Sequence, residues 1–340
     1  MSKRDAAPPS ASDAVTIDGA AVERFRRDWT ALTGAASGER ALVALSGGPD
    51  SCGLLLLVRA VLGPSCHAAT VDHGLRAAAR AEADAAAALC ASLGVDHRTL
   101  RDALPERTGG SANISARART LRYALLDAHA ERLGARWIVT AHHADDQRET
   151  VVMRLNRGSG IAGLAAIRAV EGKVVRPLLR WRRGELAAIC SAAEVATVDD
   201  PSNFDERYDR ARIRKALTEA PWLDVSAVAR SAALLGEAET ALAWTADRLA
   251  HDRCQTADHE TMLDPTGLPA ELLRRLTLRC LRRIDPGCSP RGAELSRLIE
   301  AMQEGRTAAT LGHVRVHRTR VGDPPRQQWH FRAAPPRRTR

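Results

Sequence analysis

The chain has 340 residues, of which 45% are hydrophobic, and it carries a formal net charge of +9 at pH 7. This length suits two domains, and the longest apolar stretches (41–45, 53–62 and 83–93) are too short or too interrupted by charge to span a bilayer. Residues 1–18 lack the apolar core of a signal peptide, so we expect a cytoplasmic protein with a disordered leader over these residues and no membrane partner.

The first predicted elements surround a turn of small residues. An apolar run at 41–45 is followed by Ser-Gly-Gly-Pro-Asp-Ser at 46–51 and by a second apolar run at 53–62, which predicts a strand, a turn and a helix. Two glycines allow close approach of backbone N–H groups to an anion, two serines add hydroxyl donors, and a helix N-terminus attracts negative charge. The lysine of a Walker loop is absent. This loop resembles that of the ATP pyrophosphatases, which cleave ATP between the α and β phosphates.

Further strands and helices alternate after this loop. We expect strands at 66–71, 95–100 and 137–140, and helices at 77–93 and 113–133. The alternation predicts an α/β fold with a doubly wound, Rossmann-like parallel sheet, whose ligands bind past the carboxyl ends of the strands. The chemistry should therefore lie at residues 46–51, 72–76 and 140–149.

Acidic residues follow the strand predicted at 137–140. Asp146 and Glu149 are three residues apart, so both carboxylates can share one face of the helix that begins there. Such a pair can bind a cation, either a metal ion or an ammonium group. The alternative is a charged first turn that complements the helix dipole. His142 and His143 beside the acids favour a site.

Arginines form two further clusters. Arg119 and Arg122 lie one turn apart on the helix predicted at 113–133, where they can clamp the phosphates of ATP. Another group comprises Arg207, Arg210, Arg212 and Arg214. Exposed arginines on an amphipathic helix are usually solvated, so spacing alone favours a surface role for both clusters.

The composition changes near residue 216. Helices predicted at 224–253, 268–283 and 291–304, with a short end of β character, indicate a second, mainly helical domain over 216–340, after a first domain at 19–215. Residues 314–340 hold eight arginines and one aspartate, interleaved with Trp329 and Phe331. This basic tail suits a polyanion such as RNA, although a solubilising tail has the same composition. The oligomeric state, monomer or homodimer, is left open.

The segments taken together and in order resemble the tRNA(Ile)-lysidine synthetase family, in a short form. The resemblance covers residues 40–215 and rests on Ser46 to Ser51, Asp72-His73-Gly74-Leu75-Arg76, Ala118-Arg119…Arg122-Tyr123, His142…Asp145-Asp146…Glu149-Thr150, Arg157-Gly158-Ser159-Gly160, Arg176-Pro177-Leu178-Leu179, Asp200…Ser202-Asn203, and Arg210 to Arg214.

The resemblance implies an enzyme that joins free L-lysine to C2 of the wobble cytidine of tRNA(Ile) with a CAU anticodon, through an adenylated cytidine, with ATP giving AMP and diphosphate. It assigns ATP binding to Ser46, Gly47, Gly48, Asp50, Ser51, Arg119, Arg122 and Arg214, and a Mg²⁺ ion to Asp50. Catalysis is assigned to Asp50, Asp146 and Glu149, and lysine binding to Asp146, Glu149 and Asn203. Ser115 and Ala211 depart from the family pattern, which leaves the roles of Arg117 and Arg212 open.

Other functions fit less of the sequence. A tRNA thiolase of the same loop family needs cysteine pairs, and the seven cysteines here contain no C-x-x-C. GMP and NAD synthetases use this loop without a basic RNA-binding tail. A non-catalytic tRNA-binding protein would show a broken loop or acid pair, and both are intact here.

Overall fold

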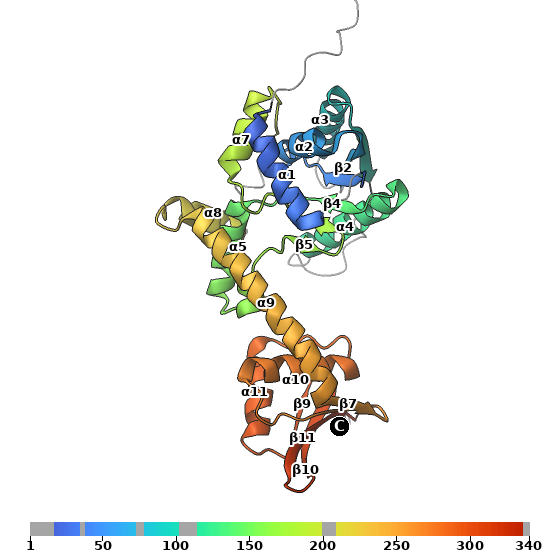
Figure 1. Ribbon diagram of the computed structural model, residues 1–340, viewed down its shortest axis with the longest axis vertical. Helices are drawn as coiled ribbons and strands as arrows, with labels where there is room; N and C mark the ends of the chain where they lie inside the picture. Colours follow the sequence, from blue (N-terminus) through green and yellow to red (C-terminus); the bar gives the residue numbers. More distant parts are fainter. Residues whose placement is uncertain (1–16, 35–37, 73–77, 102–113, 199–208, 336–340) are drawn as a thin grey trace, which may run out of the picture. The chain divides into compact units, whose positions relative to one another are not determined.

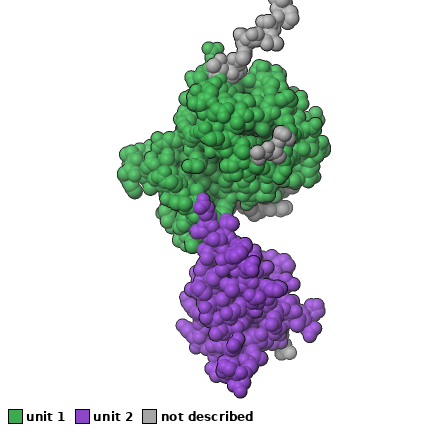
Figure 2. All heavy atoms as spheres, viewed as in Figure 1, with its two compact units in different colours: residues 1–236 green, residues 237–340 purple. Residues whose placement is uncertain are grey.

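The computed structural model describes residues 17–34, 38–72, 78–101, 114–198 and 209–335. These residues belong to two compact units, 1–236 and 237–340, which Figure 2 colours separately. Most of the expected leader, residues 1–18, lies outside the described residues; Asp18 is described and caps the first helix by accepting a hydrogen bond from the Ala20 N–H at 3.1 Å.

The first unit, whose helices include those labelled α1 to α5, α7 and α8 in Figure 1, is built on a six-stranded sheet. The strand order is β3-β2-β1-β4-β6-β5, and only β5 runs antiparallel to its neighbour. Its strands are β1 (Ala41–Ala44), β2 (Cys66–Asp72), β3 (Asp96–Arg101), β4 (Trp137–Val139), β5 (Val170–Glu171) and β6 (Val174–Val175). This architecture confirms the predicted α/β class with a doubly wound parallel sheet.

Helices cover both faces of this sheet because its strand residues alternate between two apolar cores. Ala41 and Val43 join one core with α1, α2, α3 and α7, whereas Leu42 joins another with α4. The helices of the unit are α1 (Gly19–Thr33), α2 (Pro49–Leu62), α3 (Ala78–Ser92), α4 (Ile114–Leu133), α5 (Ala144–Asn156), α6 (Ile161–Leu164), α7 (Arg183–Ala192) and α8 (Asp209–Thr218), with a 3₁₀ turn at Gly63–Ser65.

The most apolar helix, α2, is buried between the sheet and two other helices. All eight residues from Ser51 to Val58 are buried, as expected for a helix that is hydrophobic on every side. Gly53 permits the close approach of α7, because a Cβ atom there would lie 3.2 Å from the Leu186 carbonyl oxygen. This packing fixes the N-terminus of α2 beside the end of β1.

The strand order places the expected site at one edge of the sheet. β1 pairs with β2 on one side and with β4 on the other, so the order reverses at β1. The loops that leave β1 and β4 therefore meet at a topological switch point, where open α/β sheets bind their ligands. Residues 46–48 and 140–143 occupy these loops.

The second unit is an α+β structure. Its five-stranded antiparallel sheet has the order β7-β8-β11-β10-β9, with β7 (Cys254–Ala257), β8 (Glu260–Leu263), β9 (Ala308–Leu311), β10 (Val314–Val321) and β11 (Arg326–Ala333). One face buries Val314, Val316, Trp329 and Phe331 against α10 (Ala270–Ile284) and α11 (Gly292–Gln303). The helix α9 (Val225–Arg253) begins in the first unit and ends in the second.

The predicted elements from residue 66 onward agree with the observed ones within two residues at either end. The sequence did not predict α1, α6, α8, β5 or β6, and for the second unit it predicted only a short end of β character, where the structure has five strands. The basic segment expected as a tail forms β10 and β11 over most of its length. The predicted domain boundary at 215/216 lies inside α8, and the compact units divide at 236/237. Among the described helices, none combines the length and apolar composition that a bilayer crossing requires.

Candidate active site

The loop between β1 and α2 is closed by the Ser51 hydroxyl group. Its oxygen accepts hydrogen bonds from the Ser46 N–H and hydroxyl, both at 3.1 Å, and it donates to the Gly48 carbonyl at 3.0 Å. Gly47 has a φ of 84°, a left-handed conformation that favours glycine. Pro49 then starts α2, whose first N–H groups have no partners within the helix and face the loop. The local sequence thus gives the loop a geometry that fits the anion site predicted for it.

A cavity of about 360 Å³ opens in front of this loop. Its walls come from the ends of β1, β2 and β4, from the first turns of α2 and α7, and from α4, α5 and α8. The polar side chains that line it are Ser46, Asp50, Ser51, Arg119, Arg122, Tyr123, Thr140, His142, His143, Asp146, Arg183, Arg210 and Arg214. Seven of the predicted site residues therefore share one cavity wall, and Gly47 and Gly48 lie in the loop beside it. Asn203 lies outside the described residues.

His143 lies at the centre of a group of three carboxylates. It is 3% exposed, and its Nε2 atom is 3.4 Å from Asp50 Oδ2 and 3.6 Å from Asp146 Oδ2, while its Nδ1 atom is 3.6 Å from Asp145 Oδ2. Burial alone would lower the pKa of this histidine, but the hydrogen bond to Asp50 and the charges of the three acids raise it above its ordinary value. The three carboxylates thus favour the charged form of His143, whose Nε2 atom lies beside both Asp50 and Asp146 at the cavity.

Asp50 retains one carboxylate oxygen for a ligand. Its Oδ2 atom faces His143, while its Oδ1 atom is buried and has no hydrogen-bond partner among the described residues. A buried, unpartnered carboxylate oxygen beside a phosphate loop fits a hard cation such as Mg²⁺.

His142 has the opposite electrostatic character. Burial lowers its pKa to about 4, an effect that Arg176, Arg119 and Arg210 add to and that Asp146 opposes. Its Nδ1 atom lies 2.9 Å from the Thr140 hydroxyl oxygen. The pKa values of these two adjacent cavity histidines are thus shifted in opposite directions, upward for His143 and downward for His142.

Glu149 lies on the same helix face as Asp146, but its carboxylate is bonded to two arginines and does not line the cavity. Its side chain is 4% exposed and accepts hydrogen bonds from Arg214 Nε at 2.6 Å and Arg210 Nε at 3.0 Å. Among the described cavity residues, both arginines are present and Glu149 is not. The bond to Glu149 is the main reason why the pKa of Arg214 is raised. Glu149 therefore anchors two arginines of α8 on the cavity wall.

Of the two acids of the predicted pair, Asp146 is the one that faces the cavity. One of its oxygens accepts from the backbone N–H of His143 at 3.1 Å, and the other lies 3.4 Å from Arg210. Burial would raise the pKa of Asp146, but His143, Arg210 and the backbone bond together lower it. The cavity thus contains a stable negative charge, which suits recognition of a cation.

The arginines of α4 lie across the cavity from α8. Both Arg119 and Arg122 are exposed, and the Arg119 guanidinium lies 4.9 Å from the centre of the Tyr123 ring. Arg212 instead pairs with Asp209 at the start of α8. The two arginines of α4 are therefore available to an anionic ligand, whereas Arg210 and Arg214 are held by acids.

Sequence reasoning missed the roles of His143 and Arg210. The histidine pair was visible next to the acids, but the opposite shifts of the two pKa values depend on tertiary neighbours. Arg210 was grouped with solvated arginines because its partner Glu149 lies 61 residues away along the chain. Only the packing of α8 on α5 brings the two together.

The charge of His143 gives a stability test. Because the folded pKa is raised, the stabilisation is fully present below the ordinary pKa of about 6.5 and is lost as the pH rises through the folded value. We expect His143→Asn to lower the free energy of unfolding in urea more at about pH 6 than at about pH 9. An equal loss at both pH values would mean that His143 is neutral in the folded protein.

Comparison with known proteins places this site in a family. A family model described as the PP-loop domain matches residues 21–220. A tRNA(Ile)-lysidine synthase of Novosphingobium aromaticivorans is 45% identical over 331 residues, covering 95% of this chain and 97% of the relative. Another, from Zymomonas mobilis subsp. mobilis, is 39% identical over 304 residues, covering 87% and 89%. The solved U34-tRNA thiolase NcsA of Methanococcus maripaludis matches with a TM-score of 0.53 at 17% identity, covering 63% of this chain and 78% of that one, which shows a shared fold alone.

Proposed function

Because this chain belongs to the tRNA(Ile)-lysidine synthase family of PP-loop enzymes, we propose that it joins free L-lysine to C2 of the wobble cytidine of tRNA(Ile) with a CAU anticodon. ATP is converted to AMP and diphosphate, and the product is lysidine. The observation that supports this proposal best is one cavity that combines a phosphate loop with an inward-facing carboxylate, Asp146. An anion site and a cation site side by side suit ATP and lysine.

The first half-reaction adenylates the cytidine. The cytosine O2 atom attacks the α-phosphorus of ATP, and diphosphate leaves. We assign the diphosphate to the loop, where Ser46, Ser51 and the backbone of Gly47 and Gly48 provide donors at the N-terminus of α2. Arg119 and Arg122 on α4 and Arg214 on α8 neutralise the phosphate charge that grows on the leaving group.

Asp50 is the residue that would hold Mg²⁺, through its unpartnered Oδ1 atom. When bound, the ion neutralises phosphate charge and orients the diphosphate leaving group. His143 fixes the other carboxylate oxygen of Asp50 and so presets the position of the free one.

The second half-reaction transfers lysine. The ε-amino nitrogen attacks C2 of the adenylated cytidine, a C–N bond forms, and the C2–O2 bond to AMP breaks. The ammonium group must lose a proton before or during attack. Asp146 and Glu149 are assigned to pair with the ammonium and to accept that proton, with Asn203 as a further lysine ligand. Holding the amine against the activated base contributes much of the rate by proximity.

Arg210 and Arg214, which both bond to Glu149, link the binding of ATP to the binding of lysine. In the structure both oxygens of Glu149 are taken by Arg210 and Arg214, so an ammonium group can reach only Asp146. Arg214 is also an assigned phosphate ligand. When ATP draws Arg214 away, Glu149 gains a free oxygen beside Asp146. The complete lysine site therefore forms only after ATP binds.

The second unit provides a surface for tRNA. Exposed arginines on β10 and β11 include Arg315, Arg320, Arg326 and Arg332. Guanidinium groups pair well with phosphates. The affinity for tRNA should fall as the salt concentration rises, because the release of counterions from the phosphates then contributes less to binding. We therefore assign tRNA binding to β10 and β11, which form most of the basic segment at residues 314–340.

Nucleoside analysis tests the proposed reaction directly. Purified protein, ATP, labelled lysine and an unmodified tRNA(Ile) transcript with a CAU anticodon should yield labelled lysidine, with one AMP formed per lysine transferred. A transcript whose wobble base is uridine is the matched control and should remain unlabelled. Formation of ADP instead of AMP would contradict the proposal. A thiolated nucleoside would point to the thiolase alternative, although no cysteine belongs to a group of three metal-ligating side chains in the described part of the chain.

A further inference from the structure

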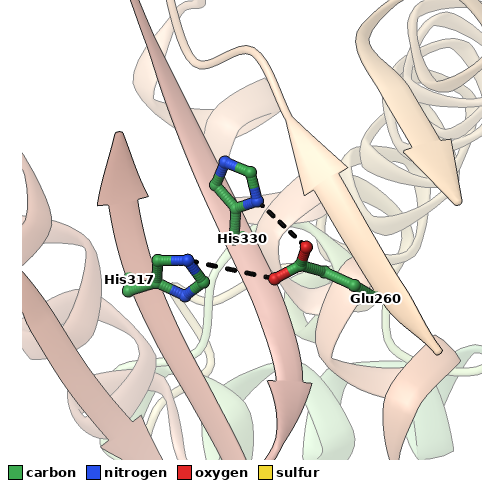
Figure 3. A group of neighbouring side chains, drawn as sticks. All are labelled: Glu260, His317 and His330. Carbon is green, nitrogen blue, oxygen red and sulfur yellow. Dashed lines mark ion pairs between the residues drawn. The ribbon is translucent and has the colours of Figure 1, made fainter. Parts of the chain in front are cut away.

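A second group of chemically active side chains lies in the second unit, apart from the cavity just described. Glu260 on β8, His317 on β10 and His330 on β11 point toward one another on the sheet (Figure 3). Their face is opposite to the one that buries Val316 and Phe331. Because His317 and His330 are directly paired in the register, the two rings stack with centroids 4.7 Å apart.

The two oxygens of Glu260 lie near the ring nitrogens of the two histidines, at separations close to those in a metal site. A tetrahedral Zn²⁺ centre with bonds of 2.0–2.1 Å holds its ligand atoms about 3.3 Å apart. Here Glu260 Oε2 is 3.2 Å from His330 Nδ1, and Glu260 Oε1 is 3.9 Å from His317 Nε2. All three ligand atoms lie within 4.8 Å of one another, and no other such group occurs among the described residues.

A second observation indicates that His330 has an unfilled ligand position. Its Nε2 atom lies 2.8 Å from the Thr319 hydroxyl oxygen, while its Nδ1 atom is buried and lacks a hydrogen-bond partner although the Glu260 carboxylate is near. In the tautomer whose Nε2–H donates to the Thr319 hydroxyl, the Nδ1 lone pair faces the Glu260 carboxylate. Two electron-rich atoms in this arrangement repel each other unless a cation lies between them. A partner on the remote ring nitrogen is also the usual support of a metal-bound histidine.

Arg332 occupies part of the same space. Its Nε atom is 3.8 Å from Glu260 Oε1 and its terminal nitrogen is 3.1 Å from His317 Nε2. Since the Arg332 side chain is 55% exposed, it can turn into solvent when another cation arrives. Arg315 also faces the group from β10, and its charge opposes a cation there. The Arg332 guanidinium thus neutralises part of the Glu260 charge, which a bound metal ion would otherwise do.

We propose that Glu260, His317 and His330 bind one divalent transition-metal ion, with Zn²⁺ as the first expectation and water completing the coordination. Imidazole nitrogen and carboxylate oxygen are ligands that suit Zn²⁺. The ion ties β8 to β10 and β11, the strands that carry the basic residues of the second unit. This inference is independent of the ligase reaction proposed for the first unit.

Equilibrium dialysis of the full-length chain tests the site. Protein stripped with EDTA is dialysed against ZnCl₂ in the presence of excess Mg²⁺, which is added to fill the Mg²⁺ site proposed at Asp50. Bound zinc is measured by mass spectrometry. We expect one zinc per chain. His330→Asn, His317→Asn and Glu260→Gln should each weaken binding at least about a hundred-fold, and Thr319→Val about ten- to a hundred-fold.

Two matched variants separate the site from general effects of substitution. His313→Asn removes an exposed histidine from the turn before β10 and should bind zinc as the unmodified chain does. Arg332→Gln removes the competing guanidinium and should tighten binding. Circular dichroism spectra of the zinc-free variants establish that each is folded. If the unmodified chain takes up no zinc, or if both histidine variants retain it, the group is an imidazolium–carboxylate ion pair and the proposal is wrong.

Discussion

Asp50→Ala is expected to lower ATP-dependent diphosphate release by at least a hundred- to a thousand-fold while leaving tRNA affinity nearly unchanged. Asp50 lines the cavity at the first turn of α2, and its unpartnered oxygen is the assigned Mg²⁺ ligand. Removing this carboxylate therefore removes the proposed ligand of the ion that would neutralise the charge on the leaving diphosphate. The basic surface of the second unit, to which tRNA binding is assigned, contains none of these groups. Release of labelled diphosphate and filter binding of tRNA measure the two effects separately.

Asp145→Asn is the matched control for this change. Asp145 also lies beside His143, at 3.6 Å, and it accepts a hydrogen bond from the Arg183 N–H at 2.9 Å, but it is not among the described residues that line the cavity. We expect its replacement to cost less than about ten-fold in rate, because it touches no reacting group. Equal loss of diphosphate release and tRNA binding in Asp50→Ala would contradict the separation of functions between the loop and the basic surface.

The parts of the fold that depend on local sequence could be predicted. Residues 46–51 have their own turn chemistry and lie between two apolar runs, so the loop and its anion-binding character follow from neighbouring residues alone. The acid pair on α5 follows from helical spacing in the same way. Alternation of strands and helices then predicts the parallel sheet and the edge at which these segments meet.

Features that depend on long-range packing could not be predicted. Glu149 and Arg214 are 65 residues apart, and their pairing requires α8 to pack on α5. In β10 and β11, apolar residues alternate with arginine and histidine, which is the pattern of a strand with one buried face. Because the segment is so basic, its composition also matches that of a solvated tail, and composition alone does not distinguish the two. For α1, the apolar residues on one side are visible in the sequence, but the position of the helix over α2 is not. That position depends on the packing of Phe25 and Trp29 in the core.

Asp146→Asn should raise the Michaelis constant for lysine about ten- to a hundred-fold, the worth of one charge-assisted hydrogen bond. This carboxylate faces the cavity and keeps its negative charge, because His143 and Arg210 outweigh burial and lower its pKa. Adenylation of cytidine should survive, since the phosphate loop is unchanged. Exchange of labelled diphosphate into ATP with tRNA bound reports that step, and lysine transfer at rising lysine concentration reports the other. Asp209→Asn, which removes an exposed acid that pairs with Arg157 and Arg212, should alter neither.

Glu149→Gln should weaken lysine transfer by a similar factor but for a partly different reason. Glu149 is bonded to Arg210 and Arg214, so in the unmodified enzyme lysine should bind appreciably more tightly once an ATP analogue has drawn Arg214 to its phosphates. Calorimetric titration of lysine with and without a non-hydrolysable analogue measures this coupling, and Glu149→Gln should abolish most of it because no carboxylate is released. If this variant or Asp146→Asn loses adenylation as severely as lysine transfer, the acid pair serves ATP or its metal ion, and lysine binds at another place on the cavity wall.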